Sequence, residues 1–315
     1  MGRFIVRRII QMIFVMFAVS VLTFLIFNVI PNGDPAVRMA GRHESASTIK
    51  AIRKEWGFDD PLPQQYVTTM RKVFSGDLKS QFTQLPVGEE IKKGIPRTFS
   101  LAIGAALLWM FVAVCFGLYS AVKAGKFADR FLTIIALVGI SMPVFWIGAL
   151  MNYYLGFKLG WFPNGGYVEF GTDPFGWFSH LILPWTALAI LFIGFYSRVL
   201  RSNVLDTINE DYVRTARAKG LSERQIMVRH VLRNSMIPII TLWGLDFGAV
   251  IGGGAILTET VFDLQGVGQY AADAVGQLDV PPVLATTMFA AFFIVLLNAI
   301  VDIAYAYLDP RIRLQ

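Results

Sequence analysis

The sequence predicts an all-α membrane protein with six transmembrane helices and a small extracytoplasmic subdomain between helices 1 and 2. Three observations carry the prediction: few charged residues, six long apolar runs, and an uneven distribution of lysine and arginine between the loops. Of the 315 residues, 55% are hydrophobic and 16% are charged, whereas about 25% of a soluble domain is charged. With a mean hydropathy of +0.55, the composition indicates a chain whose main solvent is lipid.

Six apolar runs are nearly free of charge and approach or exceed the roughly 18–20 residues that cross a hydrocarbon core. They are residues 12–30, 101–122, 131–155, 181–196, 237–257 and 283–308. The first run follows Arg3, Arg7 and Arg8, as a signal-peptide core would. It is longer than such a core, however, and residues 28–32 do not form a small-residue cleavage site, so we expect a retained span. The fourth run is long enough only if Arg198 sits at the headgroups.

Basic residues gather in the loops that would face one side of the membrane. They precede the first run, separate the second from the third and the fourth from the fifth, and follow the sixth. These residues are Arg3, Arg7, Arg8, Lys123, Lys126, Arg130, Arg198, Arg201, Arg214, Arg217, Lys219, Arg224, Arg229, Arg233, Arg311 and Arg313. The opposite short loops contain only Lys158. The positive-inside rule therefore predicts that both termini are cytoplasmic, and the net charge of +6 is interpreted as an orientation signal rather than as nucleic-acid binding.

The polar segment after the first run carries charges of both signs, and such long segments cross the membrane largely regardless of charge. Within it, Ser47 is the predicted cap of a short helix that has Ile49, Ile52 and Trp56 on one face. The predicted organisation is a tail and first span at 1–31, an extracytoplasmic subdomain at 32–97, and a transmembrane domain at 98–315 with a cytoplasmic loop at 206–235.

Motifs for catalysis, metal binding or nucleotide binding do not emerge from the sequence. A P-loop ends in Gly-Lys-Ser/Thr, but Gly125-Lys126 is followed by phenylalanine and lacks the upstream glycine. Cys115 is the single cysteine and is interpreted as a small apolar residue of the second span. The three histidines are far apart, at His43, His180 and His230. The sequence therefore predicts a non-enzyme without a cofactor or metal of its own.

The loop between the fourth and fifth runs is predicted to form a helix, a turn and a second helix. Good helix formers fill residues 211–219, and Gly220 stands where a glycine ends a helix. Ser222 and Gln225 then fit a capping box. Beyond it, the apolar residues Met227, Val228, Val231 and Leu232 share one face. Two functions fit this pair equally well by periodicity: an interfacial helix held by anionic lipid, or a rigid lever that fits a partner's groove.

The residues of this loop also resemble a known motif. The run Tyr-Val-Arg-Thr-Ala-Arg-Ala-Lys-Gly-Leu-Ser at 212–222 is similar to the EAA coupling loop of ABC importer permeases, in the form of the dipeptide/oligopeptide (DppB/OppB-like) branch. Ala216, Gly220 and Leu232 hold the second-alanine, glycine and later leucine places. The general motif differs at four positions, Arg214, Thr215, His230 and Arg233, in the manner of the B-type subunit of peptide systems.

The resemblance extends along the whole chain through short motifs in the same order and spacing. These motifs are Gly33-Asp34-Pro35-Ala36, residues 56–61 with Gln65-Tyr66, residues 76–78, 86–87, 141–146, 159–163, 259–262 and 266–268, and Asp309-Pro310-Arg311-Ile312-Arg313. Each motif alone is weak, but the series is highly specific.

The resemblance implies a type I ABC importer permease fold and a subunit that forms half of a translocation path for peptides. The implied partners are a second permease (DppC/OppC-like), two ATP-binding subunits that hold ATP and Mg²⁺, an extracytoplasmic solute-binding protein, and the lipid bilayer. The implied coupling residues are Tyr212, Arg214, Ala216, Arg217, Lys219, Gly220, Leu221, Ser222 and Leu232. Peptides are the default substrate; nickel chelates, glutathione, haem and sugars are the alternatives within the branch.

Several residues of the spans are candidates for the translocation path. A carboxylate at mid-span costs roughly 2.5–3.5 kcal/mol on insertion scales, so Asp246 should either line the path or accept a hydrogen bond from another span. The other candidates are Gly252, Gly253, Glu259 and Asn298. The glycines permit either close helix packing or a helix break. Asp302 shares a helical face with Asn298, and we expect a structural role for it near Arg311.

Two other classes of protein compete with this interpretation. A secondary transporter driven by protons or sodium would explain six spans and Asp246, but it usually shows internal repeats and several intramembrane carboxylates. A receptor or scaffold would call for an extended signalling domain, and the chain ends shortly after the sixth run. Neither class gives the capped loop a purpose.

Overall fold

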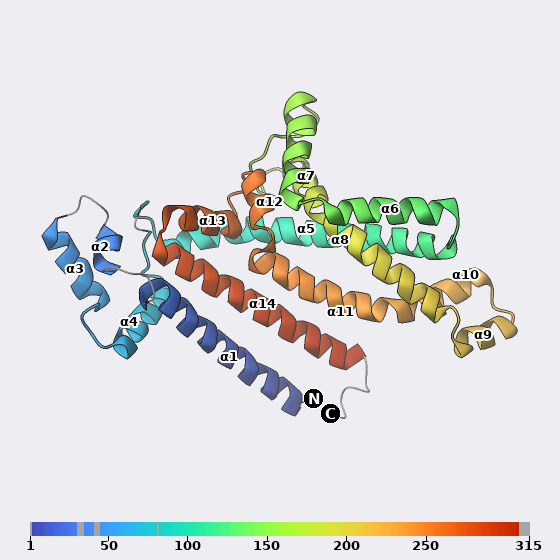
Figure 1. Cartoon of the computed structure of the whole chain (residues 1–315), viewed down its shortest axis with the longest axis horizontal. Coiled ribbons are helices and arrows are strands. Elements are labelled where there is room, and N and C mark those ends of the chain that lie inside the picture. The colour runs from blue at the N-terminus through green and yellow to red at the C-terminus, as the bar shows by residue number, and fades with distance from the viewer. Residues whose placement is uncertain (1, 30–34, 41–44, 81, 309–315) are drawn as a thin grey trace. The chain divides into compact units, whose positions relative to one another are not determined.

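The computed structural model describes residues 2–29, 35–40, 45–80 and 82–308 (Figure 1). Regular structure in these ranges is helical, apart from one isolated antiparallel bridge between Lys79 and Pro86. Five of the described helices are long and apolar enough to cross a membrane, and a bent helix pair adds a sixth span when it is counted as one. The predicted all-α membrane fold is thus confirmed. The resemblance at Gly33-Asp34 and at residues 309–313, which include Arg311, lies outside the described residues.

The helices form two compact units. One consists of Met1–Phe99, Ile251–Thr260 and Leu264–Ala299, and the other of Ser100–Val250, Val261–Asp263 and Ile300–Gln315. Helices α5 (Val87–Val122) and α14 (Val280–Leu308) each begin in the first unit and end in the second.

The first unit contains the N-terminal helices, and an amphipathic helix is fastened to the first span. Its remaining elements are α1 (Gly2–Phe24), the π-helical turn η1 (Leu25–Val29), α2 (Pro35–Ala40), α3 (Ala46–Trp56), α4 (Leu62–Ser75), α12 (Ile256–Val261) and α13 (Val267–Gln277). The Tyr66 hydroxyl on α4 lies 2.6 Å from the Ser20 hydroxyl on α1. Its ring packs edge-to-face on Phe17 and Phe24, so α4 lies along the second half of α1.

The cap of helix α3 differs from the prediction. Ser45, and not Ser47, is the N-cap: its hydroxyl accepts a hydrogen bond from the Thr48 backbone N–H at 3.3 Å. By residue type, Ser45 and Ser47 are equally good N-cap residues. Only Ser45 stands three residues before a backbone N–H, that of Thr48, which has no partner within the helix. The helix ends at Gly57, whose φ of 65° is left-handed.

The second unit contains the third and fourth predicted spans, and both differ from the prediction. Its elements are α6 (Phe127–Ser141), α7 (Val144–Met151), the π-helix η2 (Asn152–Lys158), α8 (Pro174–Thr207), α9 (Asp211–Ala218), α10 (Glu223–Ile226), the π-helix η3 (Met227–Leu232), α11 (Arg233–Ala249) and the π-helical turn η4 (Val250–Gly254), whose last four residues belong to the first unit.

The third run is two helices bent by 99°, not one straight span. Pro143 lacks a backbone N–H and forces Met142 into an extended conformation, with φ −94° and ψ 132°, which ends α6. The fourth span is longer than predicted, because α8 has 34 residues. Arg198 and Arg201 therefore lie inside a helix and not in a loop.

Small residues let the helices of the second unit approach closely. A Cβ at Gly194 on α8 would lie 2.5 Å from the Ala136 carbonyl oxygen on α6, and one at Gly104 on α5 would overlap the Trp185 ring on α8. The Trp185 indole N–H donates to the Ser100 carbonyl at 2.9 Å. Such close contacts are the usual way in which helices associate within lipid, where apolar side chains gain little by leaving their solvent.

Candidate functional site

The loop between α8 and α11 folds into the predicted helix, turn and helix. Gly220 has a φ of 80°, which only glycine adopts at little cost, and its N–H donates to the Arg217 carbonyl at 3.0 Å. Val213 and Ala216 on α9 are buried, as are Ile226 on α10 and Val231 on η3. Each part of the loop thus buries apolar residues within the protein, and the turn between the helices forms a defined corner.

The predicted capping box is confirmed at the start of α10. The Ser222 hydroxyl accepts from the Gln225 N–H at 3.4 Å, and the Gln225 side-chain oxygen accepts from the Ser222 N–H at 3.3 Å. On α9, the Tyr212 hydroxyl accepts a hydrogen bond from the Asn234 side-chain amide at 2.7 Å. The corner is therefore tied at its turn and also at the first turn of α11.

We expect Ser222→Ala to loosen this corner. Loss of an N-cap side chain costs about 1 kcal/mol of helix stability, which corresponds to roughly fivefold faster opening. Hydrogen exchange of the amides of residues 223–227 in the purified chain should accelerate by that factor. Ser202→Ala, which removes an exposed serine from the interior of α8, is the control and should leave exchange in residues 201–206 nearly unchanged.

The apolar face of the second helix differs from its prediction at one residue. Val231 is buried, but Val228 is 53% exposed. Residues 227–232 form a π-helix, whose i→i+5 hydrogen bonds rotate successive side chains away from the 3.6-residue period. Val228 therefore lies outside the buried part of the apolar face that the sequence predicts.

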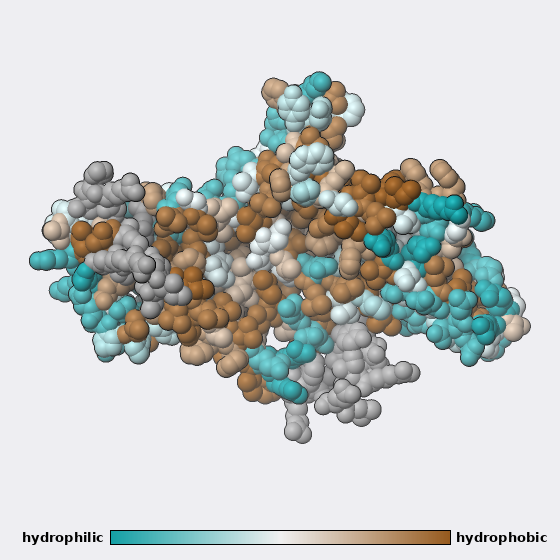
Figure 2. All heavy atoms as spheres, viewed as in Figure 1, coloured by the Kyte–Doolittle hydropathy of each residue, from teal (hydrophilic) through white to brown (hydrophobic). Residues whose placement is uncertain are grey.

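The outer face of the corner is basic and exposed. Figure 2 shows hydrophilic side chains gathered over α9 and α10. Arg214 and Lys219 are exposed, and Arg217 forms a two-pronged ion pair with Glu223 at 2.7 and 3.2 Å. This pair raises the pKa of Arg217 through the hydrogen bond. Among these charges, the apolar side chains of Tyr212 and Leu221 are 41% and 37% exposed, a mixture suited to a protein groove.

A buried ion pair that sequence analysis missed lies on the helix that leads to the corner. Arg201 on α8 donates two hydrogen bonds to Asp129 on α6, at 2.6 and 2.7 Å. The Asp129 carboxylate also accepts from the Ser120 hydroxyl at 2.5 Å and from the Gly125 N–H at 2.8 Å. Asp129 is 3% exposed. One carboxylate therefore joins α5, α6 and α8, two turns before α8 ends.

Asp246 accepts a hydrogen bond from another span, which is one of the two roles left open for it. The Tyr196 hydroxyl on α8 donates to its carboxylate at 2.6 Å. Asp246 is partly exposed, whereas Tyr196 is fully buried. The hydrogen bond satisfies one carboxylate oxygen in a region where an isolated charge is costly.

The two candidate glycines have different local roles. A Cβ at Gly252 would overlap the Ile294 side chain on α14, so this glycine permits close packing. Gly253 has φ 133° and ψ −10° inside the π-helical turn, so it breaks the helix. Close helix packing and a helix break, the two roles considered for these glycines, thus both occur, at adjacent residues.

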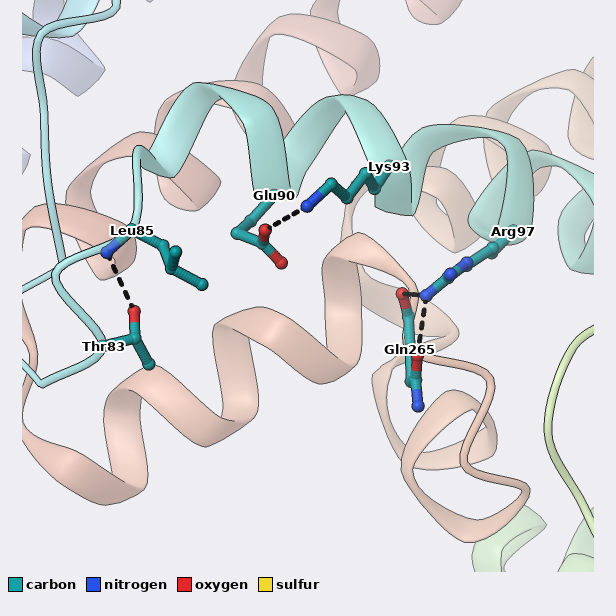
Figure 3. A network of polar contacts seen from close by, with 6 residues as sticks. All are labelled: Thr83, Leu85, Glu90, Lys93, Arg97 and Gln265. Atoms are coloured by element: carbon teal, nitrogen blue, oxygen red, sulfur yellow. Dashed lines mark hydrogen bonds and ion pairs between the residues drawn. The ribbon is translucent and has the colours of Figure 1, made fainter.

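Glu259 is fully buried within the first unit and holds three segments together. Its carboxylate accepts from the Thr98 hydroxyl on α5 at 2.7 Å and from the Gln269 N–H on α13 at 2.8 Å. Thr98 in turn accepts from the Val267 N–H at 2.9 Å. Nearby, Arg97 on α5 donates to the carbonyl and side-chain oxygens of Gln265, in the connection between α12 and α13, both at 3.0 Å (Figure 3). The stretch from α12 to α13 is thus fastened to α5.

Burial raises the pKa of Glu259 above its ordinary value of 4.5, although its hydrogen bonds act in the opposite direction. Because the folded protein binds the proton more tightly than the unfolded chain, this residue stabilises the fold more as the pH falls, until the pH reaches about 4.5. The difference in thermal midpoint between wild type and Glu259→Gln should therefore shift in favour of wild type as the pH is lowered through the raised pKa. A difference that does not vary with pH would show that Glu259 does not titrate in this range.

The last path candidate, Asn298, is partly buried on α14, one turn before Asp302 on the same helix. The structure therefore places the candidates in separate surroundings: Asp246 beside Tyr196, Gly252 against α14, and Glu259 in a closed polar cluster. The coupling candidates, by contrast, all lie on one short segment of chain.

These features define a polytopic helical membrane protein with a rigid basic corner between two spans. Residues 113–314 match the family model for the "Binding-protein-dependent transport system inner membrane component", and residues 1–89 match the model for the N-terminal part of such membrane components. The chain belongs to this family and is a multi-pass inner-membrane component of a binding-protein-dependent transport system.

Curated relatives align over nearly the whole chain. The "Probable peptide ABC transporter permease protein y4tP" of Sinorhizobium fredii is 38% identical and covers 99% of this chain and 100% of its own. The "Oligopeptide transport system permease protein AppB" of Bacillus subtilis is 34% identical, with coverage of 99% and 100%. The "Probable D,D-dipeptide transport system permease protein DdpB" of Escherichia coli is 36% identical, with 96% and 94%.

Solved structures confirm the fold. A chain of the inward-facing MetNI methionine ABC transporter superposes with a TM-score of 0.54 at 15% identity, covering 71% of this chain and 96% of that one. A chain of an amino acid ABC transporter solved with histidines gives 0.51 at 14% identity, with coverage of 70% and 94%. The fold is that of type I ABC importer permeases.

Proposed function

We propose that this chain forms half of the translocation path of an ATP-driven peptide importer and that the α9–α10 corner couples it to ATPase subunits. The observation that carries the coupling role is the continuity of the helix beyond the turn. Residues 223–249 run without interruption from α10 through η3 to the end of α11, and the helix breaks only beyond them, at Gly253. A force applied at the corner is therefore applied directly to a membrane span.

The rigidity of the corner supports its use as a lever. An interfacial helix held by lipid needs only an apolar face and basic residues. This segment instead buries apolar residues of α9, α10 and η3 within the protein and exposes its charges, together with Tyr212 and Leu221. Such a surface suits a protein groove with acidic walls better than a lipid surface. Closure of the ATPase subunits on ATP would then move α9, the turn and the attached span together.

The proposed assembly follows from family membership and from what this chain lacks. A second, related permease would complete the path, two ATPase subunits would bind ATP and Mg²⁺, and a solute-binding protein would deliver the substrate. This chain itself would be non-catalytic and would bind no cofactor. In the proposed orientation both termini and the corner are cytoplasmic, because the basic residues of the short loops lie on that side.

Peptides are the proposed substrates because relatives that align over at least 94% of their length are named as peptide, oligopeptide or dipeptide permeases. Asp246 offers a carboxylate that suits the cationic amino terminus of a free peptide. Asp246→Asn tests this contribution: a path role predicts slower import with unchanged assembly, whereas unchanged import would leave Asp246 with its structural hydrogen bond to Tyr196.

Affinity purification of the tagged chain from its native membranes in mild detergent tests the assembly. We expect a second six-span permease, ATPases with Walker motifs and a binding protein to co-purify. Recovery of the chain alone or as a homo-oligomer, under conditions that preserve other membrane complexes, would contradict the proposal and favour an ion-coupled transporter.

A further inference from the structure

An apolar groove of about 250 Å³ lies within the first unit, between α1, α4, the first turns of α5, and α14. Its lining residues are all apolar or glycine and include Met16, Phe74, Ile91, Met288 and Phe292. Its volume exceeds the roughly 150 Å³ of an apolar protein cavity that stays dry and binds benzene. Methionines on two of the walls can adapt to a flexible guest.

The groove reaches hydrocarbon depth. Two of its walls belong to candidate spans, Val6–Phe27 on α1 and Val280–Ile303 on α14. At a rise of about 1.5 Å per residue, Met16 lies roughly 16 Å from the Phe27 end of its span, and Phe292 roughly 18 Å from the Val280 end. Since the hydrocarbon core is about 30 Å thick, these walls are far from water, and lipid tails surround the spans.

A polar edge accompanies the apolar groove. Helix α4 is amphipathic and packs along α1 through Tyr66, which suits a helix at the membrane interface. Phe74 lines the groove and is 76% exposed. Arg71, also exposed, precedes Phe74 by three residues and therefore shares its face of the helix. A guest with an apolar tail and a phosphate would meet both features.

We propose that this groove is a binding site for one bilayer phospholipid, whose acyl chain lies between α1, α4, α5 and α14 and whose phosphate faces Arg71. The bound acyl chain completes the packing of α4 on the spans of α1 and α14. The site depends only on the membrane location of the chain and not on peptide import, so the two proposals fail independently.

The groove can be filled without disturbing its walls. Gly88 lines it, and a Cβ built there would have no atom within 4 Å, so Gly88→Phe places a ring in the open space. Gly276, on α13, has equally open surroundings and does not line the groove. Gly276→Phe is therefore a matched control. Ala285→Leu on α14 is a second, milder filling variant.

The test is photolabelling of the purified transporter in phosphatidylethanolamine and phosphatidylglycerol vesicles, with a phospholipid that carries a diazirine in its acyl chain. We expect saturable labelling of peptides containing Met16, Met288 and Phe292. Exposed Leu107 and Phe111 on α5, which lie on a separate peptide, report ordinary surrounding lipid, whose labelling should not saturate. Each buried methylene contributes roughly fourfold to binding, so Gly88→Phe should lower groove labelling at least about tenfold, and Gly276→Phe should not.

Non-saturable labelling of the groove peptides in wild type would show that only surrounding lipid contacts them. This result would overturn the proposal, whether or not the variants fold. Absence of groove labelling in the complex, with labelling restored in the isolated chain, would assign the groove to a protein partner instead. Labelling that is unchanged in both well-folded filling variants would also contradict the site.

Discussion

Gly220→Pro is expected to abolish ATP-driven transport while the chain still assembles in the membrane. Proline fixes φ near −65°, whereas Gly220 has a φ of 80° and donates its N–H to the Arg217 carbonyl. The substitution therefore destroys both the turn and a hydrogen bond, at a combined cost of about 3 kcal/mol. If the partner groove recognises the native corner, that cost corresponds to a loss of about a hundredfold in coupled transport.

Peptide uptake and substrate-stimulated ATPase activity should be measured together in proteoliposomes, because loss of coupling lowers both while assembly persists. Gly160→Pro is the matched control. Gly160 also has a left-handed φ, of 64°, donates its N–H to a carbonyl, and has open space around its Cβ position. We expect this control to retain most transport. Coupled ATPase activity that survives in Gly220→Pro would contradict the lever role of the corner.

Asp129→Asn is expected to give the largest loss of stability among single polar substitutions in the second unit. Removing one partner of a buried ion pair typically costs about 3–5 kcal/mol, and because the Arg201 side chain is 30% exposed we expect about 2–4 kcal/mol. Ser120 and Gly125 also lose a charged acceptor. The thermal midpoint of the purified transporter in detergent should therefore fall by several degrees.

The ion pair between Arg217 and Glu223 provides the internal control. It has similar bidentate geometry, but its side chains are 47% and 68% exposed. Exposed pairs contribute little to stability because water and salt screen them, so Glu223→Gln should scarcely move the midpoint. Equal shifts for Asp129→Asn and Glu223→Gln would show that the Asp129 pair does not hold α6 and α8 together.

Local signals in the sequence predicted the geometry of the α9–α10 corner well. Gly220, Ser222 and Gln225 act on neighbours within a few residues, and the structure places each as the helix-end rules require. Apolar run length likewise predicted the spans, because a hydrocarbon core imposes a minimum length. The same local rules failed where two signals compete, as for Ser45 and Ser47 at α3.

Features that depend on tertiary contacts could not be predicted. Asp129 and Arg201 are 72 residues apart. From the sequence, Arg201 resembles any basic residue of a cytoplasmic loop, but the structure places it within α8. Hydropathy likewise cannot show that Pro143 turns the third span by 99°, since both halves are apolar. The packing of Gly252 on Ile294 and the closed cluster of Glu259 depend on which helices meet, and a single sequence does not contain that information.

Uptake of a labelled peptide into proteoliposomes tests the central claim most directly. The vesicles should contain this chain with its co-purifying permease and ATPases, and the binding protein should be added on the outside. We predict accumulation that requires both internal ATP and the binding protein and that persists when proton and sodium gradients are collapsed. Accumulation driven by such a gradient without ATP would contradict the account and identify an ion-coupled transporter.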